Sequence, residues 1–158
     1  MKKGAYFSED KKYRYKLWRI WDETKPQVGF IGLNPSLADF EKDDPTILKL
    51  ISLSKNWGYG GLTISNLFAY ISKYPKELVK VNDPVGNENN KYIIELIATC
   101  DIIVLMWGNS GTLFKRNLEV MDLLSQYKLF CVSTTKLGNP IHPLYKRGDS
   151  PLESYVLK

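Results

Sequence analysis

The chain has 158 residues, of which 44% are hydrophobic and 25% are charged, as expected for one globular domain large enough to bury a core. It contains no apolar run near the ~20 residues that span a bilayer, and its basic N-terminus lacks the apolar core of a signal peptide, so we expect a cytoplasmic protein with no membrane partner. The formal net charge of +5 comes entirely from residues 1–21, which hold seven Lys or Arg and two Asp or Glu.

Segment 13–21, YRYKLWRIW, mixes aromatic and basic residues. It predicts a strand at the edge of a sheet, where Lys and Arg protect the edge from aggregation. Basic side chains interleaved with Tyr13, Tyr15, Trp18 and Trp21 could also contact phosphates. A solvated strand face with aromatic packing beneath it is the simpler interpretation.

The remainder of the chain alternates short apolar runs with segments of helical spacing. Strands are predicted at 27–33, 62–68, 102–107 and 128–133, and helices at 44–58, 87–100 and 111–127, with a turn or one-turn helix at 73–78. In the first helix, Asp44 can cap the N-terminus, Pro45 suits the first helical position and Gly58 ends the helix.

Alternating strands and helices predict a three-layer α/β/α fold with right-handed crossovers. Its central sheet is expected to have four mostly parallel strands, with segment 13–21 as an additional N-terminal edge strand. No repeat, linker or low-complexity stretch divides the chain. Residues 1–158 are therefore expected to form a single domain.

Cys100 and Cys131 lie in or beside apolar runs, IATCDIIVL and LFCVS. We expect two buried free thiols in a reducing compartment rather than a disulfide. Two separated cysteines and one histidine do not make a metal cluster. We therefore expect neither a metal ion nor any other cofactor.

Polar residues follow each of the four predicted central strands. They are Asn34, Pro35 and Ser36 after the first strand, Asn66 at the end of the second, Trp107, Gly108, Asn109 and Ser110 after the third, and Thr134, Thr135, Asn139 and His142 beyond the fourth. Open α/β sheets bind ligands outside the carboxyl ends of their strands. We expect these residues to converge on one edge of the sheet.

The residue types suit a nucleobase. An Asn side chain offers a carbonyl acceptor and an NH₂ donor, which match the edge of a base. The backbone amides of Ser36 or of 110–112 could hold an anion if they open a helix. Trp107, Phe68 and Tyr70 could stack on a base, which is worth ~1–3 kcal/mol.

Each residue also has a simpler interpretation. Asn34 before Pro35 is a common turn dipeptide, and a lone loop histidine such as His142 is often a surface residue. Asn66 in an apolar strand is harder to explain in this way, because a buried amide without partners costs ~1–3 kcal/mol.

Five motifs, in order along the chain, resemble the domain-of-unknown-function family 1643 (DUF1643). They are GLNPSLAD (32–39), DDPTI (43–47), NWGYGGLTISNLFAY (56–70), PVGNENN (84–90) and VLMWGNSG (104–111). The resemblance covers about residues 13–155, and the family's name assigns no activity. The motif order is also similar, more distantly, to the uracil-DNA glycosylase superfamily.

The distant similarity implies specific roles. Asn34 would position or activate water, Asn66 would read the base edge, and His142 would stabilise negative charge on the leaving base. Asn34 and His142 are thus the expected catalytic residues. The expected ligand-binding residues are Gly32, Leu33, Pro35, Ser36, Asp44, Asn66, Phe68, Trp107, Gly108, Asn109, Ser110, Lys146 and Arg147.

The sequence also departs from that superfamily. In that superfamily the loop that carries the histidine usually reads His-Pro-Ser-Pro, and its serines contact DNA phosphates. In this chain the same loop reads His-Pro-Leu-Tyr. This favours a small ligand or a single strand over duplex DNA repair. The nearby acidic residues Asp39, Asp43 and Asp44 are the candidate acids. The sequence predicts no oligomeric state.

Three functions remain open at this point. The first is hydrolysis of the N-glycosidic bond of a base or nucleotide. The second is non-catalytic binding or sequestration of a nucleotide or a nucleotide-derived signal. The third is salt-sensitive DNA or RNA binding through segment 1–21. The expected partner is a nucleobase, nucleotide or related small molecule, with nucleic acid as the other candidate.

Overall fold

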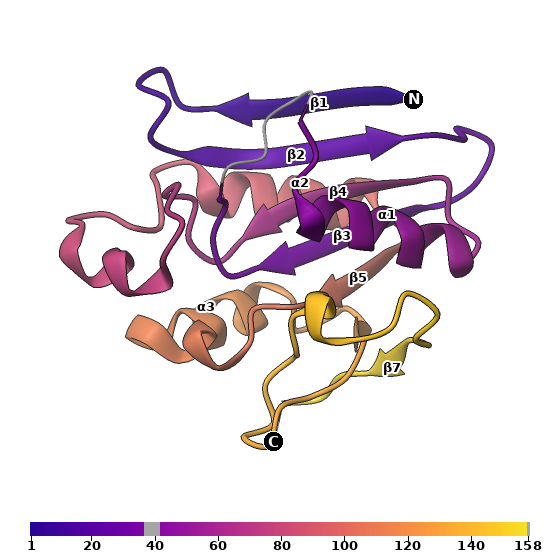
Figure 1. Cartoon of the computed structure of the whole chain (residues 1–158). Helices are drawn as coiled ribbons and strands as arrows, with labels where there is room; N and C mark the ends of the chain where they lie inside the picture. Colours follow the sequence, from indigo (N-terminus) through magenta and orange to yellow (C-terminus); the bar gives the residue numbers. More distant parts are fainter. Residues whose placement is uncertain (37–41, 158) are drawn as a thin grey trace.

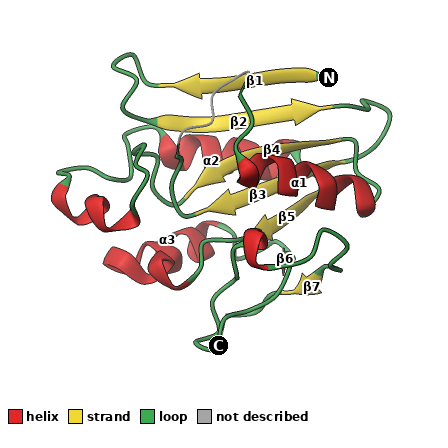
Figure 2. Cartoon of the chain, viewed as in Figure 1, coloured by secondary structure: helices red, strands yellow, loops and turns green. Residues whose placement is uncertain are grey.

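A computed structural model describes residues 1–36 and 42–157, which form a seven-stranded sheet with helices on both faces (Figures 1 and 2). The strands are β1 (Lys2–Phe7), β2 (Arg14–Ile20), β3 (Gln27–Gly32), β4 (Gly61–Asn66), β5 (Ile102–Leu105), β6 (Leu129–Cys131) and β7 (Glu153–Ser154). Their order across the sheet is β1-β2-β4-β3-β5-β6-β7.

The sheet is mixed. Strands β4, β3, β5 and β6 run parallel to one another, whereas β2 and β1 on one side and β7 on the other pair antiparallel. The predicted α/β class is confirmed. The predicted sheet of four strands plus one edge strand is wrong in extent, because the sheet has seven strands.

Helices cover both faces of the sheet (Figure 1). They are α1 (Pro45–Asn56), α2 (Asn89–Thr99) and α3 (Arg116–Leu123), with short 3₁₀ helices η1 (Pro75–Lys80), η2 (Asn109–Lys115) and η3 (Pro143–Tyr145). Successive strand residues point to opposite faces. Accordingly, Phe30 and Ile64 pack beneath α1, whereas Ile31 and Leu105 pack against α2 and α3.

The first helix begins and ends as its sequence predicts. Asp44 Oδ1 accepts a hydrogen bond of 2.9 Å from the backbone N–H of Ile47, and Pro45 occupies the first turn. Gly58 follows the helix with a φ of 90°, a conformation that glycine adopts without strain. No described helix has the length and apolar character needed to cross a membrane.

Two predicted elements are corrected. Segment 13–21 is not an edge strand, because β2 pairs with both β1 and β4. Strand β1 lacks the alternation of apolar and polar residues that would predict a strand from the sequence. Its position depends on a tertiary contact, because the Trp18 ring packs over Gly4, where a Cβ would lie 2.0 Å from the ring. The predicted helix 111–127 is broken, because Phe114 and Lys115 have φ values of 55° and 56° and α3 begins at Arg116.

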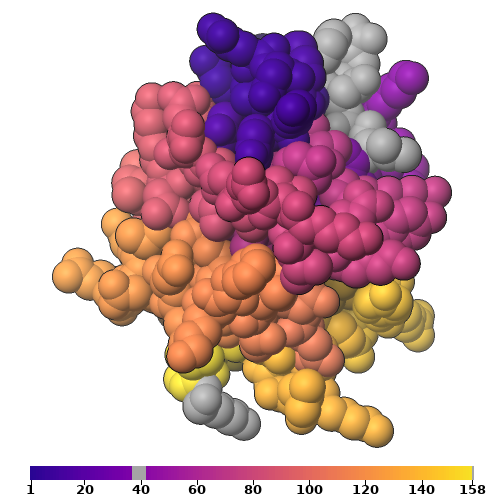
Figure 3. Space-filling model, turned by 90° about the vertical axis from the view of Figure 1, so that its left-hand side faces the viewer, coloured from indigo at the N-terminus to yellow at the C-terminus, as the bar shows by residue number. Residues whose placement is uncertain are grey.

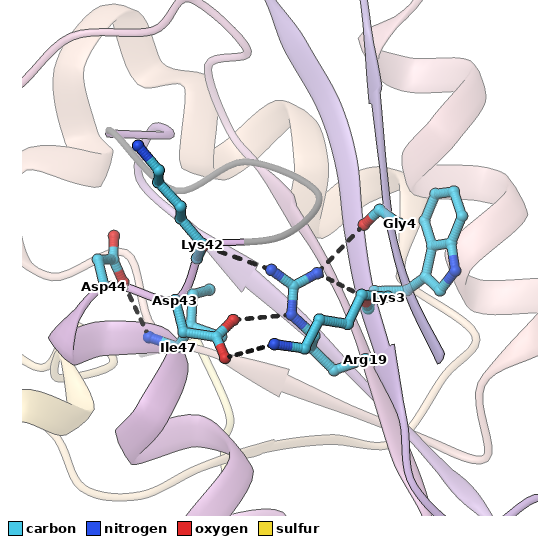
Figure 4. Close-up of polar contacts among 8 residues, drawn as sticks. Lys3, Gly4, Arg19, Lys42, Asp43, Asp44 and Ile47 are labelled. Carbon is cyan, nitrogen blue, oxygen red and sulfur yellow. Dashed lines mark hydrogen bonds and ion pairs between the residues drawn. The ribbon is translucent and has the colours of Figure 1, made fainter. Parts of the chain in front are cut away.

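The basic segment is only partly solvated, because Arg19 is fully buried. Its Nε donates to Asp43 Oδ1 at 2.8 Å, and its Nη1 donates to the carbonyl of Trp18 at 2.8 Å. Lys3 Nζ lies 3.4 Å from the second oxygen of Asp43 (Figure 4). These contacts tie β1 and β2 to the segment that enters α1.

Replacing Asp43 by alanine removes the carboxylate that faces the buried Arg19. Breaking a buried ion pair costs ~3–5 kcal/mol, and the remaining carbonyl partners of Arg19 reduce this, so we expect a loss of about 2–3 kcal/mol in the free energy of unfolding. Urea titration followed by tryptophan fluorescence measures it. The matched control is Glu23→Ala, which breaks the exposed Lys2–Glu23 pair and should cost less than about 1 kcal/mol. Equal effects of the two variants would contradict the anchoring role.

Candidate functional site

A cavity of about 200 Å³ opens at the carboxyl ends of β3, β4 and β5, on the face covered by α1. Figure 3 views the molecule from the side on which these strands end. We call this cavity the strand-end pocket. The described residues that line it are Arg14, Gly32, Leu33, Asn34, Pro35, Ser36, Asp44, Thr46, Ile47, Ile64, Asn66, Ser72, Lys73, Pro75, Met106 and His142.

Asn66 is the last residue of β4, and its side chain is 4% exposed. Within the described part of the chain, its buried Nδ2 has no hydrogen-bond partner. A buried amide left in this state costs ~1–3 kcal/mol. Gly32 makes room for it, since a Cβ there would lie 2.7 Å from Asn66 Oδ1. Asn66 also lines the strand-end pocket, so this unpartnered donor belongs to a residue of the pocket wall.

The backbone that carries Asn66 is held from the opposite face of the sheet. Asn89 Nδ2 donates to the carbonyl oxygens of Asn66 at 2.8 Å and Leu67 at 3.0 Å. Arg116 Nε donates to the same Leu67 oxygen at 2.8 Å. Asn89 and Arg116 are 0% and 1% exposed. Because the end of β4 is fixed in this way, the Asn66 side chain has a defined direction.

Asn34 follows β3, and its side-chain nitrogen and oxygen have different roles. Its Nδ2 donates to the carbonyls of Ser72 at 2.9 Å and Pro35 at 3.1 Å. These bonds join the end of β3 to the loop after β4. Among the described residues, no donor bonds its Oδ1. Asn34 therefore contributes an oriented acceptor to the pocket.

His142 comes from the C-terminal loop, which α1 holds in place through a bond from Lys49 Nζ to the Lys146 carbonyl at 2.8 Å. Its Nδ1 accepts from the Leu144 N–H at 3.2 Å, so the neutral ring carries its proton on Nε2. Burial lowers the pKa of His142, and the charge of Asp44 acts in the opposite direction. At neutral pH the imidazole is a neutral donor.

Arg14 reaches the pocket because of a β-bulge. Tyr6 pairs with Lys16 and Phe7 pairs with Arg14, so Tyr15 is an extra residue on β2. A bulge changes the face to which a side chain points, and Arg14 thereby shares the face of α1. Burial lowers its pKa to about 10, with Asp44 raising the pKa and Arg19 lowering it further. The guanidinium therefore stays charged at neutral pH.

The profile of the family described as "Protein of unknown function (DUF1643)" matches residues 14–144. The chain belongs to this family. No curated protein and no solved structure matches it significantly. The matched region of the DUF1643 fold includes every described residue that lines the strand-end pocket.

About half of the expected site residues meet in this DUF1643 pocket. Those that line it are Gly32, Leu33, Asn34, Pro35, Ser36, Asp44, Asn66 and His142. Asp44 has a structural task there, because its two oxygens accept from the Ile47 N–H and from Ser36 Oγ at 3.0 Å. Asp43 pairs with Arg19 outside the lining. Asp39 lies outside the described residues.

The other expected residues lie elsewhere in the structure. They are Phe68, Trp107, Gly108, Asn109, Ser110, Lys146 and Arg147. Trp107 and Phe68 belong to the core beneath α2 and α3. Side chains alternate between the two faces, so Met106 lines the pocket and its neighbour Trp107 points to the opposite face. The expectation that Trp107 lies beside Asn34, Asn66 and His142 is therefore wrong.

The expected site residues in the loops lie outside the pocket for a different reason. Asn109 Oδ1 accepts from Thr135 Oγ1 at 2.6 Å and from Asn139 Nδ2 at 2.9 Å, which joins two loops. Ser110 lies beside Leu113 in a separate groove next to η1. Arg147 pairs with Asp149 at the surface. Asn109 and Ser110 follow β5 closely in the sequence, and Arg147 lies in the long loop after β6, but all three lie outside the lining of the pocket.

The sequence also leaves several lining residues undetected. These are Arg14, Thr46, Ile47, Ile64, Ser72, Lys73, Pro75 and Met106. The alternation of side chains between the two faces of β4 and β5 could have indicated Ile64 and Met106 from the sequence. In the sequence, Arg14 is one of several basic residues and nothing distinguishes it. No local signal predicts the bulge at Tyr15 that directs Arg14 toward the pocket.

Burial raises the pKa of the Cys100 and Cys131 thiols to about 11. Both cysteines are free, and Cys131 is buried whereas Cys100 is partly buried. A protonated thiol is a poor nucleophile. Neither cysteine lines the strand-end pocket.

Replacing Asn89 by alanine tests how the pocket amide is held. It removes the donor to two buried carbonyls, so we expect a loss of about 2 kcal/mol in the free energy of unfolding. We also expect a shift of the Asn66 side-chain amide signals in a ¹H–¹⁵N NMR spectrum. The exposed Asn87 provides the matched control, Asn87→Ala, which should change neither quantity. Unchanged Asn66 signals in Asn89→Ala would contradict the positioning role.

The depressed pKa of His142 predicts a pH dependence of stability. Below the ordinary value of 6.5, the unfolded chain binds a proton that the folded chain resists, so stability is lost as pH falls below that value. His142→Asn should remove this acid-side loss and leave the profile above pH 6.5 parallel to wild type. The chain has one histidine, so its proton NMR titration gives the pKa directly. A midpoint at or above 6.5 would contradict the burial effect.

Proposed function

We propose that this DUF1643 member recognises a nucleobase-type ring in the strand-end pocket and hydrolyses the N-glycosidic bond to that ring. The observation that carries the proposal is the buried Asn66 side chain, whose Nδ2 has no hydrogen-bond partner among the described residues. An amide presents a donor and an acceptor side by side, which matches a ring edge that has the complementary pair.

The size of the pocket agrees with a single ring. A cavity of ~150 Å³ is sufficient to bind benzene, and the strand-end pocket has about 200 Å³. A base fits this volume, while a sugar and phosphate would extend toward solvent. Ile47, Ile64 and Met106 supply apolar lining for the ring.

The remaining polar groups suit the chemistry of glycosidic cleavage. Asn34 Oδ1 can accept a hydrogen bond from the attacking water, whose oxygen would form the new bond to the sugar carbon and whose proton would pass to solvent. The electron pair of the broken C–N bond would pass to the base. The Nε2–H of His142 would stabilise the negative charge that develops there, as preorganised donors do at other developing anions.

A second candidate, non-catalytic capture of a nucleotide or a nucleotide-derived signal, is favoured by one observation. Asp44 is the carboxylate in the described lining of the pocket, and hydrogen bonds from Ile47 and Ser36 already engage both of its oxygens. An asparagine cannot act as a general base. Hydrolysis would therefore depend on positioning and on an activated leaving base, whereas capture needs neither.

A thermal-shift screen of bases, nucleosides and nucleotides tests base recognition. We expect stabilisation by at least one ring ligand and its loss in Asn66→Ala, because the amide contact is removed. Ser110→Ala is the control, since Ser110 lies outside the pocket, and it should bind as wild type. Binding that survives in Asn66→Ala would contradict the assignment of this pocket.

Mass spectrometry of the ligands that bind then separates the two functions. Hydrolysis predicts release of the free base, slowed by roughly 10²–10³-fold in His142→Ala with ligand affinity largely retained. Recovery of intact ligand after prolonged incubation would contradict hydrolysis and support capture.

A further inference from the structure

Two exposed tyrosines, Tyr74 and Tyr145, lie beside residues that line the strand-end pocket, and each has lysines next to it. Tyr74 lies between Lys73 and Pro75, both of which line the pocket. Tyr145 lies next to His142, with their ring centroids 6.1 Å apart at 71°. Tyr74 is 51% exposed and Tyr145 is 79% exposed. Two aromatic rings are therefore available to a ligand that extends beyond the pocket.

Positive charge accompanies both rings. The Nζ atoms of Lys73 and Lys76 each lie 5.7 Å from the centre of the Tyr74 ring. Lys146 directly follows Tyr145, and its backbone is fixed by the bond from Lys49. Two acidic residues of the described part of the chain near the rim have partners: Glu77 accepts from Ser72 Oγ at 2.8 Å, and Asp149 pairs with Arg147 at 3.3 Å.

We infer that this rim, formed by Tyr74, Lys76, Tyr145 and Lys146, binds single-stranded nucleic acid, with one base of the strand inserted into the strand-end pocket. The inference rests on the proposed recognition of a base and names the class of ligand that presents it. The pocket holds about one ring, so the adjoining phosphates and bases must lie outside, where the rim offers cations and stacking faces.

The rim favours a single strand over a duplex. Every base has a flat face, so exposed aromatic side chains can stack on unpaired bases of any sequence, while lysines follow the phosphates. In a duplex those faces are covered by neighbouring pairs, and a base must be flipped out at a cost before it can enter a pocket.

Fluorescence anisotropy with a fluorescein-labelled single-stranded DNA of mixed sequence, about 12 nucleotides long, tests the inference. Lys76→Glu/Lys146→Glu should weaken binding at least tenfold and lower the slope of log affinity against log salt by about 1.4, since two phosphate contacts are lost. Tyr145→Ala should weaken binding by roughly five- to hundredfold.

Each variant has a matched control. Lys11→Glu/Lys12→Glu makes the same change in net charge at the exposed β1–β2 hairpin, and it also tests the basic N-terminal segment. Tyr127→Ala removes another exposed tyrosine, 51% accessible, near the end of α3. Both controls should bind the strand as wild type. Thermal midpoints should change little in all four variants, because the altered residues are exposed apart from Lys146, which is partly buried.

Deoxynucleoside 5′-monophosphates, tested by thermal shift, distinguish this inference from the proposed function. Rim variants that lose the strand but keep the mononucleotide response support the inference. The inference would be overturned if the protein did not bind the strand, or if binding did not depend on the rim residues. It would also be overturned if the control variants lost as much affinity, or if the matching duplex bound equally well, even where mononucleotides still bind. Rim-dependent strand binding that Asn66→Ala leaves intact would overturn base insertion and, with it, the proposed function.

Discussion

Two backbone carbonyls at the end of β4 set the constraint on which the pocket depends. Where a strand leaves its sheet, its backbone oxygens lose their ladder partners and need other donors if they are buried. Asn89 and Arg116 supply those donors from the face opposite the pocket. The backbone is thereby satisfied, and the Asn66 side chain is fixed toward a space that contains no described partner for its donor.

The charges around the pocket follow from burial and from one shared carboxylate. Asp44 acts on both Arg14 and His142, while hydrogen bonds from Ile47 and Ser36 hold it at the start of α1. Desolvation disfavours the charged form of a buried base. For His142 this yields a neutral donor, whereas Arg14, whose ordinary pKa is far higher, keeps its charge. The described lining therefore offers fixed dipoles for hydrogen bonding together with a buried cation, Arg14, and a second cation, Lys73.

The pocket combines groups with different degrees of restraint. Asn34 and Asn66 project from the ends of parallel strands whose backbones are held by the sheet. His142 comes from a loop, but bonds from Lys49, Asn56 and Trp57 to the carbonyls of residues 146, 148 and 150 fasten that loop to α1. Sites placed on rigid elements keep their geometry. This helix thus supports both the pocket wall and the loop that completes it.

The sequence by itself determined the α/β class, the four parallel strands, the caps of α1 and the place of Asn34 and Asn66 at strand ends, because these depend on local periodicity and on the rule that parallel strands end at one edge. The position of His142 depends instead on a loop that α1 holds through tertiary contacts. Only the tertiary structure decided which of the two alternating sets of side chains on each strand lies under α1. A shift of one residue exchanges Met106 for Trp107, and one extra residue at Tyr15 directs Arg14 into the pocket. The place of strand β1 likewise depends on its pairing with β2, and no local pattern in the sequence marks the positive φ values of Phe114 and Lys115 that break the helix before α3.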